Sequence, residues 1–167
     1  MKPAVFFDRD GVLNVEKHFV YKREDFEWMP GAAEAVGLLN RLGYHVFVVT
    51  NQSGVARGFY RMEDVAALHG FMNGELAGCG AKIDSFYVCP HHPAFGPPCL
   101  CRKPRPGLLL AAIDEYAVDK ERSFLIGDKD TDIEAAAGAG IKGYLFQAGN
   151  LCERVKTILR KQNREKT

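Results

Sequence analysis

Short, nearly continuous apolar runs alternate with amphipathic segments along the whole chain. Continuous runs rich in β-branched and aromatic residues are typical of strands that are buried on both faces of a sheet. The runs predict strands at residues 5–7, 46–49, 83–88, 124–126 and 144–146. The segments between them predict helices at residues 32–42, 62–76, 107–116 and 133–139, followed by a last helix at 154–160. This alternation predicts an α/β fold, a three-layer Rossmann-like parallel sheet with helices on both faces.

The length of 167 residues suits a single domain that covers residues 1–167, with no internal repeat or linker. Two stretches, 14–30 and 89–106, follow neither the strand pattern nor the helix pattern. Long irregular loops inside compact domains are usually functional, so we expect both stretches to contribute to a site.

Composition and charge exclude several classes of protein. A hydrophobic fraction of 47%, a charged fraction of 26% and a net charge of +1 give no electrostatic reason to expect nucleic acid or a membrane as partner. The apolar run at the start is cut short by Asp8, unlike a signal peptide, and no run is long enough to span a membrane. We therefore expect a soluble cytoplasmic protein. We also expect a monomer, because no apolar stripe marks an interface.

The second irregular stretch concentrates metal-binding side chains. Three of the five cysteines lie in it, which fits metal ligation in a reducing compartment better than a disulfide framework. Three thiolates and one imidazole make a closed tetrahedral zinc site with no open position for substrate, so we expect one structural zinc ion. The alternative is a set of reduced cysteines without metal. The expected ligands, with His91 rather than His92, are Cys89, His91, Cys99 and Cys101.

Polar side chains stand where the predicted strands end. Taken alone, none of these side chains indicates a functional site, because polar turns, helix caps and surface lysines are common in such positions. Ligands of open α/β sheets bind at the carboxyl ends of the strands, so we expect these side chains to lie together. Within the acidic loop 127–132, Asp128 is the better metal ligand and Asp132 orders the loop. The set is Asp8, Asp10, Thr50, Asn51, Lys103 and Asp128.

Such a set predicts a magnesium and phosphate site. A divalent ion held by Asp8 and Asp128 would neutralise phosphate charge and let a carboxylate attack phosphorus. Asp10 would then protonate the leaving oxygen and afterwards activate water. Lys103, just ahead of a predicted helix, would pair with the phosphate dianion.

Four segments, DRDG, TNQSGVARG, CPHHP with CLCRKPRPG, and GDKDTD, occur in this order. Together they resemble the haloacid dehalogenase (HAD) superfamily over nearly the whole chain, and within it the family of heptose 1,7-bisphosphate phosphatases. The resemblance implies that Asp8 is the nucleophile and Asp10 the general acid and base. It also implies a phosphoryl site at Thr50 and Lys103. The remaining implied roles are magnesium binding by Asp8, Asp128 and the backbone carbonyl of Asp10, and substrate contacts by Asn51, Arg102 and Lys129.

The resemblance also implies a substrate and an architecture. The expected reaction is hydrolysis of the 7-phosphate of a small sugar bisphosphate through an aspartyl-phosphate, in heptose precursor biosynthesis for lipopolysaccharide or related glycans. Because the insertions are short, we expect no separate cap domain. The loops at 14–30, 54–61 and 89–102 would then shape specificity, and the zinc-bound loop would place Arg102 and Lys103.

Three other functions compete with this one. The nearest is a histidinol-phosphate phosphatase, which has the same metal and zinc pattern but tends to differ in the segment after TNQ. A phosphatase acting on nucleic-acid 3′-phosphates would need a basic groove, and the only basic bias here is the tail at 154–166. A non-enzymatic zinc adaptor would not need the aspartates Asp8, Asp10 and Asp128.

Overall fold

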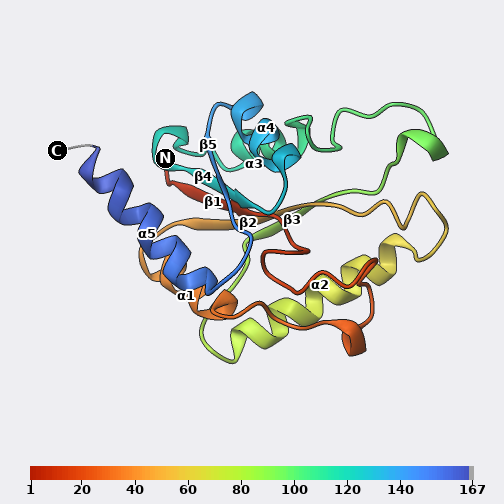
Figure 1. Ribbon diagram of the computed structural model, residues 1–167, viewed down its shortest axis with the longest axis horizontal. Coiled ribbons are helices and arrows are strands. Elements are labelled where there is room, and N and C mark those ends of the chain that lie inside the picture. The colour runs from red at the N-terminus through yellow and green to blue at the C-terminus, as the bar shows by residue number, and fades with distance from the viewer. Residues whose placement is uncertain (166–167) are drawn as a thin grey trace.

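The computed structural model describes residues 1–165 and has the three-layer α/β architecture that the sequence predicts (Figure 1). Five parallel strands form one sheet in the order β3-β2-β1-β4-β5. The strands are β1 (Ala4–Phe7), β2 (His45–Asn51), β3 (Ser85–Cys89), β4 (Phe124–Gly127) and β5 (Lys142–Leu145). The helices are α1 (Ala32–Arg41), α2 (Met62–Ala77), α3 (Gly107–Glu115), α4 (Asp130–Ala139) and α5 (Leu151–Arg164).

The sheet divides the core into two parts. Successive side chains of a strand point to opposite faces. On one face, Val5 and Phe7 of β1 pack with residues of α1, α2 and α5. On the other face, Ala4 and Phe6 pack with residues of α3 and α4. All four of these side chains are fully buried, which explains why the strand reads as a continuous apolar run.

The starts of all elements lie within three residues of their predicted positions, and the largest difference is at the end of α5, Arg164, four residues later than predicted. Polar side chains explain two of the differences. β3 begins at Ser85, two residues later than predicted, because the Asp84 carboxylate accepts a hydrogen bond from the Val46 N–H at 2.8 Å. α5 begins at Leu151, three residues earlier than predicted, because the Asn150 side chain caps its first turn. No helix within residues 1–165 combines the length and the apolar character needed to cross a membrane.

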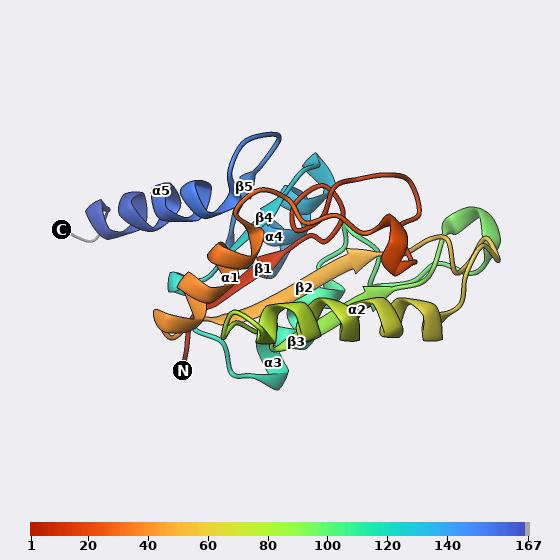
Figure 2. The same cartoon turned by 90° about the horizontal axis from the view of Figure 1, so that it is seen from below.

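The irregular stretches gather at one edge of the sheet. All strands run in the same direction, so their carboxyl ends share this edge. Figure 2 shows the segment after β1, the segment after β2 and the segment after β3 around the arrowhead of β2. Within the described residues, the two irregular stretches contain the short 3-10 turns Arg23–Asp25 and Pro93–Phe95, an isolated β-bridge between Asn14 and Trp28, and the last residue of β3, Cys89. Neither stretch therefore forms a cap domain, as predicted.

Candidate active site

Three carboxylates converge at the carboxyl end of the sheet. Asp8 follows β1, Asp128 follows β4, and Asp132 lies in the first turn of α4. One oxygen of each carboxylate lies within 4.8 Å of the others, a spacing that suits a single cation. The sequence predicts Asp8 and Asp128 here, and the structure adds Asp132, which was expected only to order the loop.

Two glycines make room for these carboxylates. Gly11 has a φ of +85°, and a Cβ atom built on it would lie 2.2 Å from Asp128 Oδ2. A Cβ atom on Gly127 would lie 2.2 Å from Asp132 Cβ. Position 11 therefore requires glycine for two reasons: its backbone is in the left-handed region, and a side chain there would collide with the Asp128 carboxylate.

The donor atoms of this cluster fit a hard divalent cation. Asp128 Oδ1 is buried and has no hydrogen-bond partner. A buried carboxylate oxygen without a partner is costly, and a cation ligated there would remove that cost. Oxygen ligands from carboxylates and a backbone carbonyl are those that Mg²⁺ prefers.

Lys103 is the buried cation of the cluster. Its Nζ lies 2.9 Å from Asp8 Oδ1 and 2.6 Å from Asp132 Oδ1, and it donates to the Val49 carbonyl at 2.9 Å. Burial raises the pKa of Asp8 to about 8, even though the Lys103 ammonium acts in the opposite direction. One ammonium therefore does not compensate the whole acidic cluster, which again favours a bound divalent cation.

Replacing Lys103 by methionine should abolish phosphatase activity and lower the free energy of unfolding by about 3 kcal/mol, since it leaves buried carboxylates unpaired. Denaturant unfolding in magnesium-free buffer checks the stability, and phosphate release checks the activity. Lys142→Met is the matched control, because Lys142 pairs with Glu165 on the surface. Its effect should be small. Equal stability of the two variants would contradict the assigned role of Lys103.

Asp10 is held by three donors. Its Oδ1 accepts from Arg9 at 2.8 Å and from Asn14 at 3.0 Å, and its Oδ2 accepts from Gln52 at 2.9 Å. Burial acts to raise the pKa of Asp10, but the Arg9 guanidinium and these hydrogen bonds together hold it below its ordinary value. The arrangement favours the ionised carboxylate, the form that a general base requires.

Gln52 is a central residue that the sequence analysis missed. Its Nε2 donates to both Asp10 and the Thr50 hydroxyl, at 2.9 and 2.8 Å, while its Oε1 accepts from the Tyr60 hydroxyl at 2.6 Å. Because Tyr60 donates to the amide oxygen, the amide nitrogen must face Asp10 and Thr50. Gln52 lies in the same TNQSG segment as Thr50, but its partner Tyr60 comes eight residues later, and no sequence signal connects the two.

A cleft of about 330 Å³ opens beside these groups. It narrows into a recess of about 70 Å³ that reaches Asp8 and Asp132. Thr50 is fully buried and is joined to the cleft through Gln52, whose Nε2 donates to its hydroxyl. Of the predicted residues, the cleft is lined by Asp10, Asn51, Arg102, Lys103 and Lys129. The loops 14–30 and 54–61, which were expected to shape specificity without individual residues being named, also line the cleft, through Glu16, His18, Phe19 and Tyr60.

Two of the predicted substrate contacts also hold the loop before α3. The Asn51 amide accepts from the Lys103 N–H at 3.1 Å and donates to the Lys103 carbonyl at 3.2 Å. Arg102 donates to the His91 carbonyl at 3.3 Å. These contacts fix Arg102 and Lys103 relative to β2 and to the cysteine cluster.

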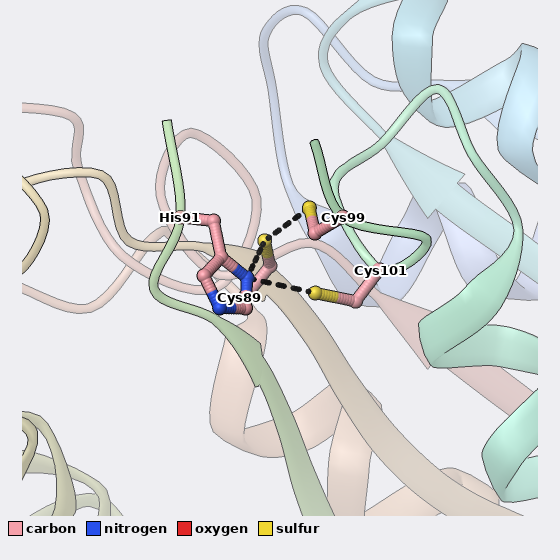
Figure 3. Close-up of side chains that lie close together, drawn as sticks. All are labelled: Cys89, His91, Cys99 and Cys101. Atoms are coloured by element: carbon pink, nitrogen blue, oxygen red, sulfur yellow. Dashed lines mark hydrogen bonds between the residues drawn. The ribbon is translucent and has the colours of Figure 1, made fainter. Parts of the chain in front are cut away.

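The four predicted zinc ligands lie together (Figure 3). Cys89 Sγ lies 3.7 Å from Cys99 Sγ and 3.6 Å from His91 Nδ1, and His91 Nδ1 lies 3.3 Å from Cys101 Sγ. Sulfur atoms around a tetrahedral zinc ion are separated by about 3.8 Å, so the donor set fits this ion. His91, and not His92, joins the cluster, as the sequence analysis expected.

The parallel sheet, the paired aspartates after β1, the buried lysine and the acidic loop together define a hydrolase of the HAD type. A model of the HAD-hydrolase-like family matches residues 100–164. The chain is 48% identical to D-glycero-beta-D-manno-heptose-1,7-bisphosphate 7-phosphatase of Rhodopseudomonas palustris, over 95% of this chain and 91% of the relative. It is 42% identical to the protein of the same name from Pasteurella multocida, over 85% and 79% of the two chains.

A solved structure agrees with these relatives. D,D-heptose 1,7-bisphosphate phosphatase from B. bronchiseptica, in complex with magnesium and phosphate, superimposes with a TM-score of 0.87 at 31% identity, covering 96% of this chain and 99% of that one. The chain therefore belongs to the D-glycero-beta-D-manno-heptose-1,7-bisphosphate 7-phosphatase family. The resemblance read from its sequence motifs is confirmed.

Proposed function

We propose that the chain hydrolyses the 7-phosphate of D-glycero-D-manno-heptose 1,7-bisphosphate, in heptose precursor biosynthesis for lipopolysaccharide or related glycans. The observation that carries the proposal is the 48% identity to a phosphatase of this name over 95% of the chain. The acidic cluster, the buried Lys103 and the adjacent cleft supply the groups that a phosphatase needs. These relatives do not favour histidinol phosphate as the substrate.

Asp8 is the nucleophile of the proposed mechanism. One of its carboxylate oxygens attacks the phosphorus of the 7-phosphate, the bond between phosphorus and the sugar oxygen breaks, and an aspartyl-phosphate forms. Asp10 enters this step in its protonated form and gives that proton to the departing sugar oxygen. Asp10, then ionised, removes a proton from the water that attacks the aspartyl-phosphate, the bond between phosphorus and the Asp8 oxygen breaks, and inorganic phosphate and the free Asp8 carboxylate are released. The donors around Asp10 favour this ionised form and hold it beside the cleft.

Thr50 and Lys103 bind the transferring phosphoryl group. The Thr50 hydroxyl accepts its hydrogen bond from Gln52, which leaves its own proton free to donate to a phosphoryl oxygen. Lys103 supplies a positive charge next to Asp8. Asn51, Arg102 and Lys129 line the cleft and contact the rest of the substrate.

Asp8, Asp128 and the backbone carbonyl of Asp10 would hold magnesium, which neutralises phosphate charge and orients the phosphoryl group. The relative from B. bronchiseptica binds magnesium and phosphate, which supports this choice of ion. Zinc at the cysteine cluster would be structural, because a Cys₃His set leaves no position for substrate. We also propose one domain, residues 1–167, and a cytoplasmic location, where reduced thiols are available for zinc.

Phosphate release tests the proposal. With magnesium present, kcat/KM for heptose 1,7-bisphosphate should exceed that for histidinol phosphate by about 100-fold or more, because contacts to the sugar and to the second phosphate are lost with the smaller substrate. A 3′-phosphorylated oligonucleotide should be a poor substrate. Preference for histidinol phosphate would retain the catalytic assignments and overturn the substrate. Activity on none of the three would favour the zinc adaptor.

A further inference from the structure

Arg57 lies where three loops meet. These are the first loop (14–30), the second loop (54–61), which contains Arg57, and the zinc loop (89–106). The guanidinium carbon lies 5.9 Å from the centre of the Phe19 ring in the first loop and 5.1 Å from that of Phe95 in the zinc loop. Its Nη2 also lies 3.3 Å from His92 Nε2. One side chain of the second loop thus contacts both of the other loops.

Neighbouring ring contacts extend this junction. Phe19 packs edge-to-face on Phe59, with ring centres 5.0 Å apart, and His92 packs on Phe95 at 5.5 Å. A guanidinium within about 6 Å of an aromatic ring is attracted by the ring's electron-rich face. The Nε of Arg57 is buried and has no hydrogen-bond partner, so the guanidinium is held by the two ring faces and by the contact of its Nη2 with His92 Nε2.

The junction borders the cleft, and the contacts of the Arg57 guanidinium are to Phe19, Phe95 and His92 rather than to the reacting groups. Phe19 lines the cleft, while His92 lines a neighbouring hollow that shares Arg102 and Lys103 with it. Asp8 and Lys103, in contrast, are held by strand ends and by each other. A change at the junction should therefore move the wall that receives the sugar and leave the phosphoryl site in place.

We propose that Arg57 is a positioning residue, a clasp that joins the first loop to the zinc loop and thereby preforms the outer wall of the cleft for a large sugar phosphate. The proposal rests on the proposed heptose bisphosphate activity. The proposal also gives the zinc cluster a role in substrate binding. The zinc ligands His91 and Cys99 flank the segment that carries His92 and Phe95, so metal binding would fix the two side chains that Arg57 contacts.

Steady-state kinetics of Arg57→Ala test the clasp with three substrates: heptose 1,7-bisphosphate, heptose 7-phosphate and p-nitrophenyl phosphate. KM for both sugar phosphates should rise roughly tenfold, the expected effect of losing two weak cation–π contacts and the contact with His92, with kcat within about twofold. Both constants for p-nitrophenyl phosphate should stay unchanged, because this compound needs only the phosphoryl site. Arg57→Lys should recover part of the loss.

Arg23→Ala is the matched control. Arg23 makes a contact of the same kind, 4.6 Å from the Phe71 ring centre, but it joins the first loop to α2 rather than to the zinc loop. This variant should keep the wild-type KM. An equal rise in KM for Arg23→Ala would show that any loosening of the first loop weakens substrate binding, and it would refute the proposed role of Arg57.

A double-mutant cycle provides the second test. If Arg57 acts through Phe95, then Arg57→Ala combined with Phe95→Leu should give the KM of Arg57→Ala alone. Effects that multiply would overturn the clasp, as would a KM rise confined to the bisphosphate, which would indicate direct binding of the second phosphate. Bound zinc near one ion per chain reports that the variants are folded. Failure of the wild-type protein to act on either sugar phosphate would instead refute the proposed function.

Discussion

An Asp8→Asn variant should lose phosphate release by a factor on the order of 10⁴ or more, as expected when a covalent nucleophile is removed. An amide does not attack phosphorus as a carboxylate does. The fold should persist, because the asparagine oxygen can still accept a hydrogen bond from Lys103, which lies 2.9 Å from Asp8 Oδ1. Removing one of three clustered carboxylates also reduces their mutual repulsion. Phosphate release with saturating magnesium and a thermal melt check both parts.

Asp130→Asn is the matched control for this variant. Asp130 is exposed at the start of α4, two residues after Asp128, and lies outside the carboxylate cluster. Its activity should stay within about twofold of wild type, as expected for a surface substitution. Substantial activity of Asp8→Asn in a preparation free of other phosphatases would refute the assignment of Asp8 as nucleophile.

The convergence of the site could be predicted because parallel strands have a simple geometry. Val5–Phe7, Val46–Val49 and Phe124–Ile126 read as continuous apolar runs, and their order along the chain requires helical crossovers. Any polar residue that directly follows such a run must lie at the same edge of the sheet. This rule alone brings Asp8 and Asp128 together, and the structure confirms it.

The supporting groups could not be predicted because they depend on loop conformation. Arg9, between two aspartates in sequence, reads as a solvated residue, yet it is fully buried and bonds Asp10 and the Val20 carbonyl. Its environment is set by His69 of α2, whose ring lies 3.4 Å away. Burial lowers the pKa of His69 to about 3, and Arg9 acts in the same direction, so the imidazole stays neutral beside the guanidinium. No periodicity encodes such a contact across 60 residues.

The zinc loop has little backbone bonding of its own. Residues 89–106 contain six prolines, which lack the N–H that such bonding needs: Pro90, Pro93, Pro97, Pro98, Pro104 and Pro106. Within the described part of this loop, the short-range backbone bonds are Phe95 N–H to the His92 carbonyl and Arg105 N–H to the Arg102 carbonyl. A chain segment so poor in its own bonds needs an external constraint, and the Cys₃His cluster is placed to provide it.

Cys101→Ser should therefore reduce stability before it affects chemistry. Loss of a thiolate ligand weakens zinc binding, and zinc binding contributes to folding free energy, so we expect a loss of about 3 kcal/mol or a melting temperature lower by roughly 10 °C. The zinc content measured by elemental analysis should fall well below one ion per chain. Cys79→Ser is the matched control, because Cys79 is exposed and lies outside the cluster. It should melt as the wild type does. A Cys101→Ser protein with normal melting temperature and no activity would mean that the cluster serves the reaction rather than the fold.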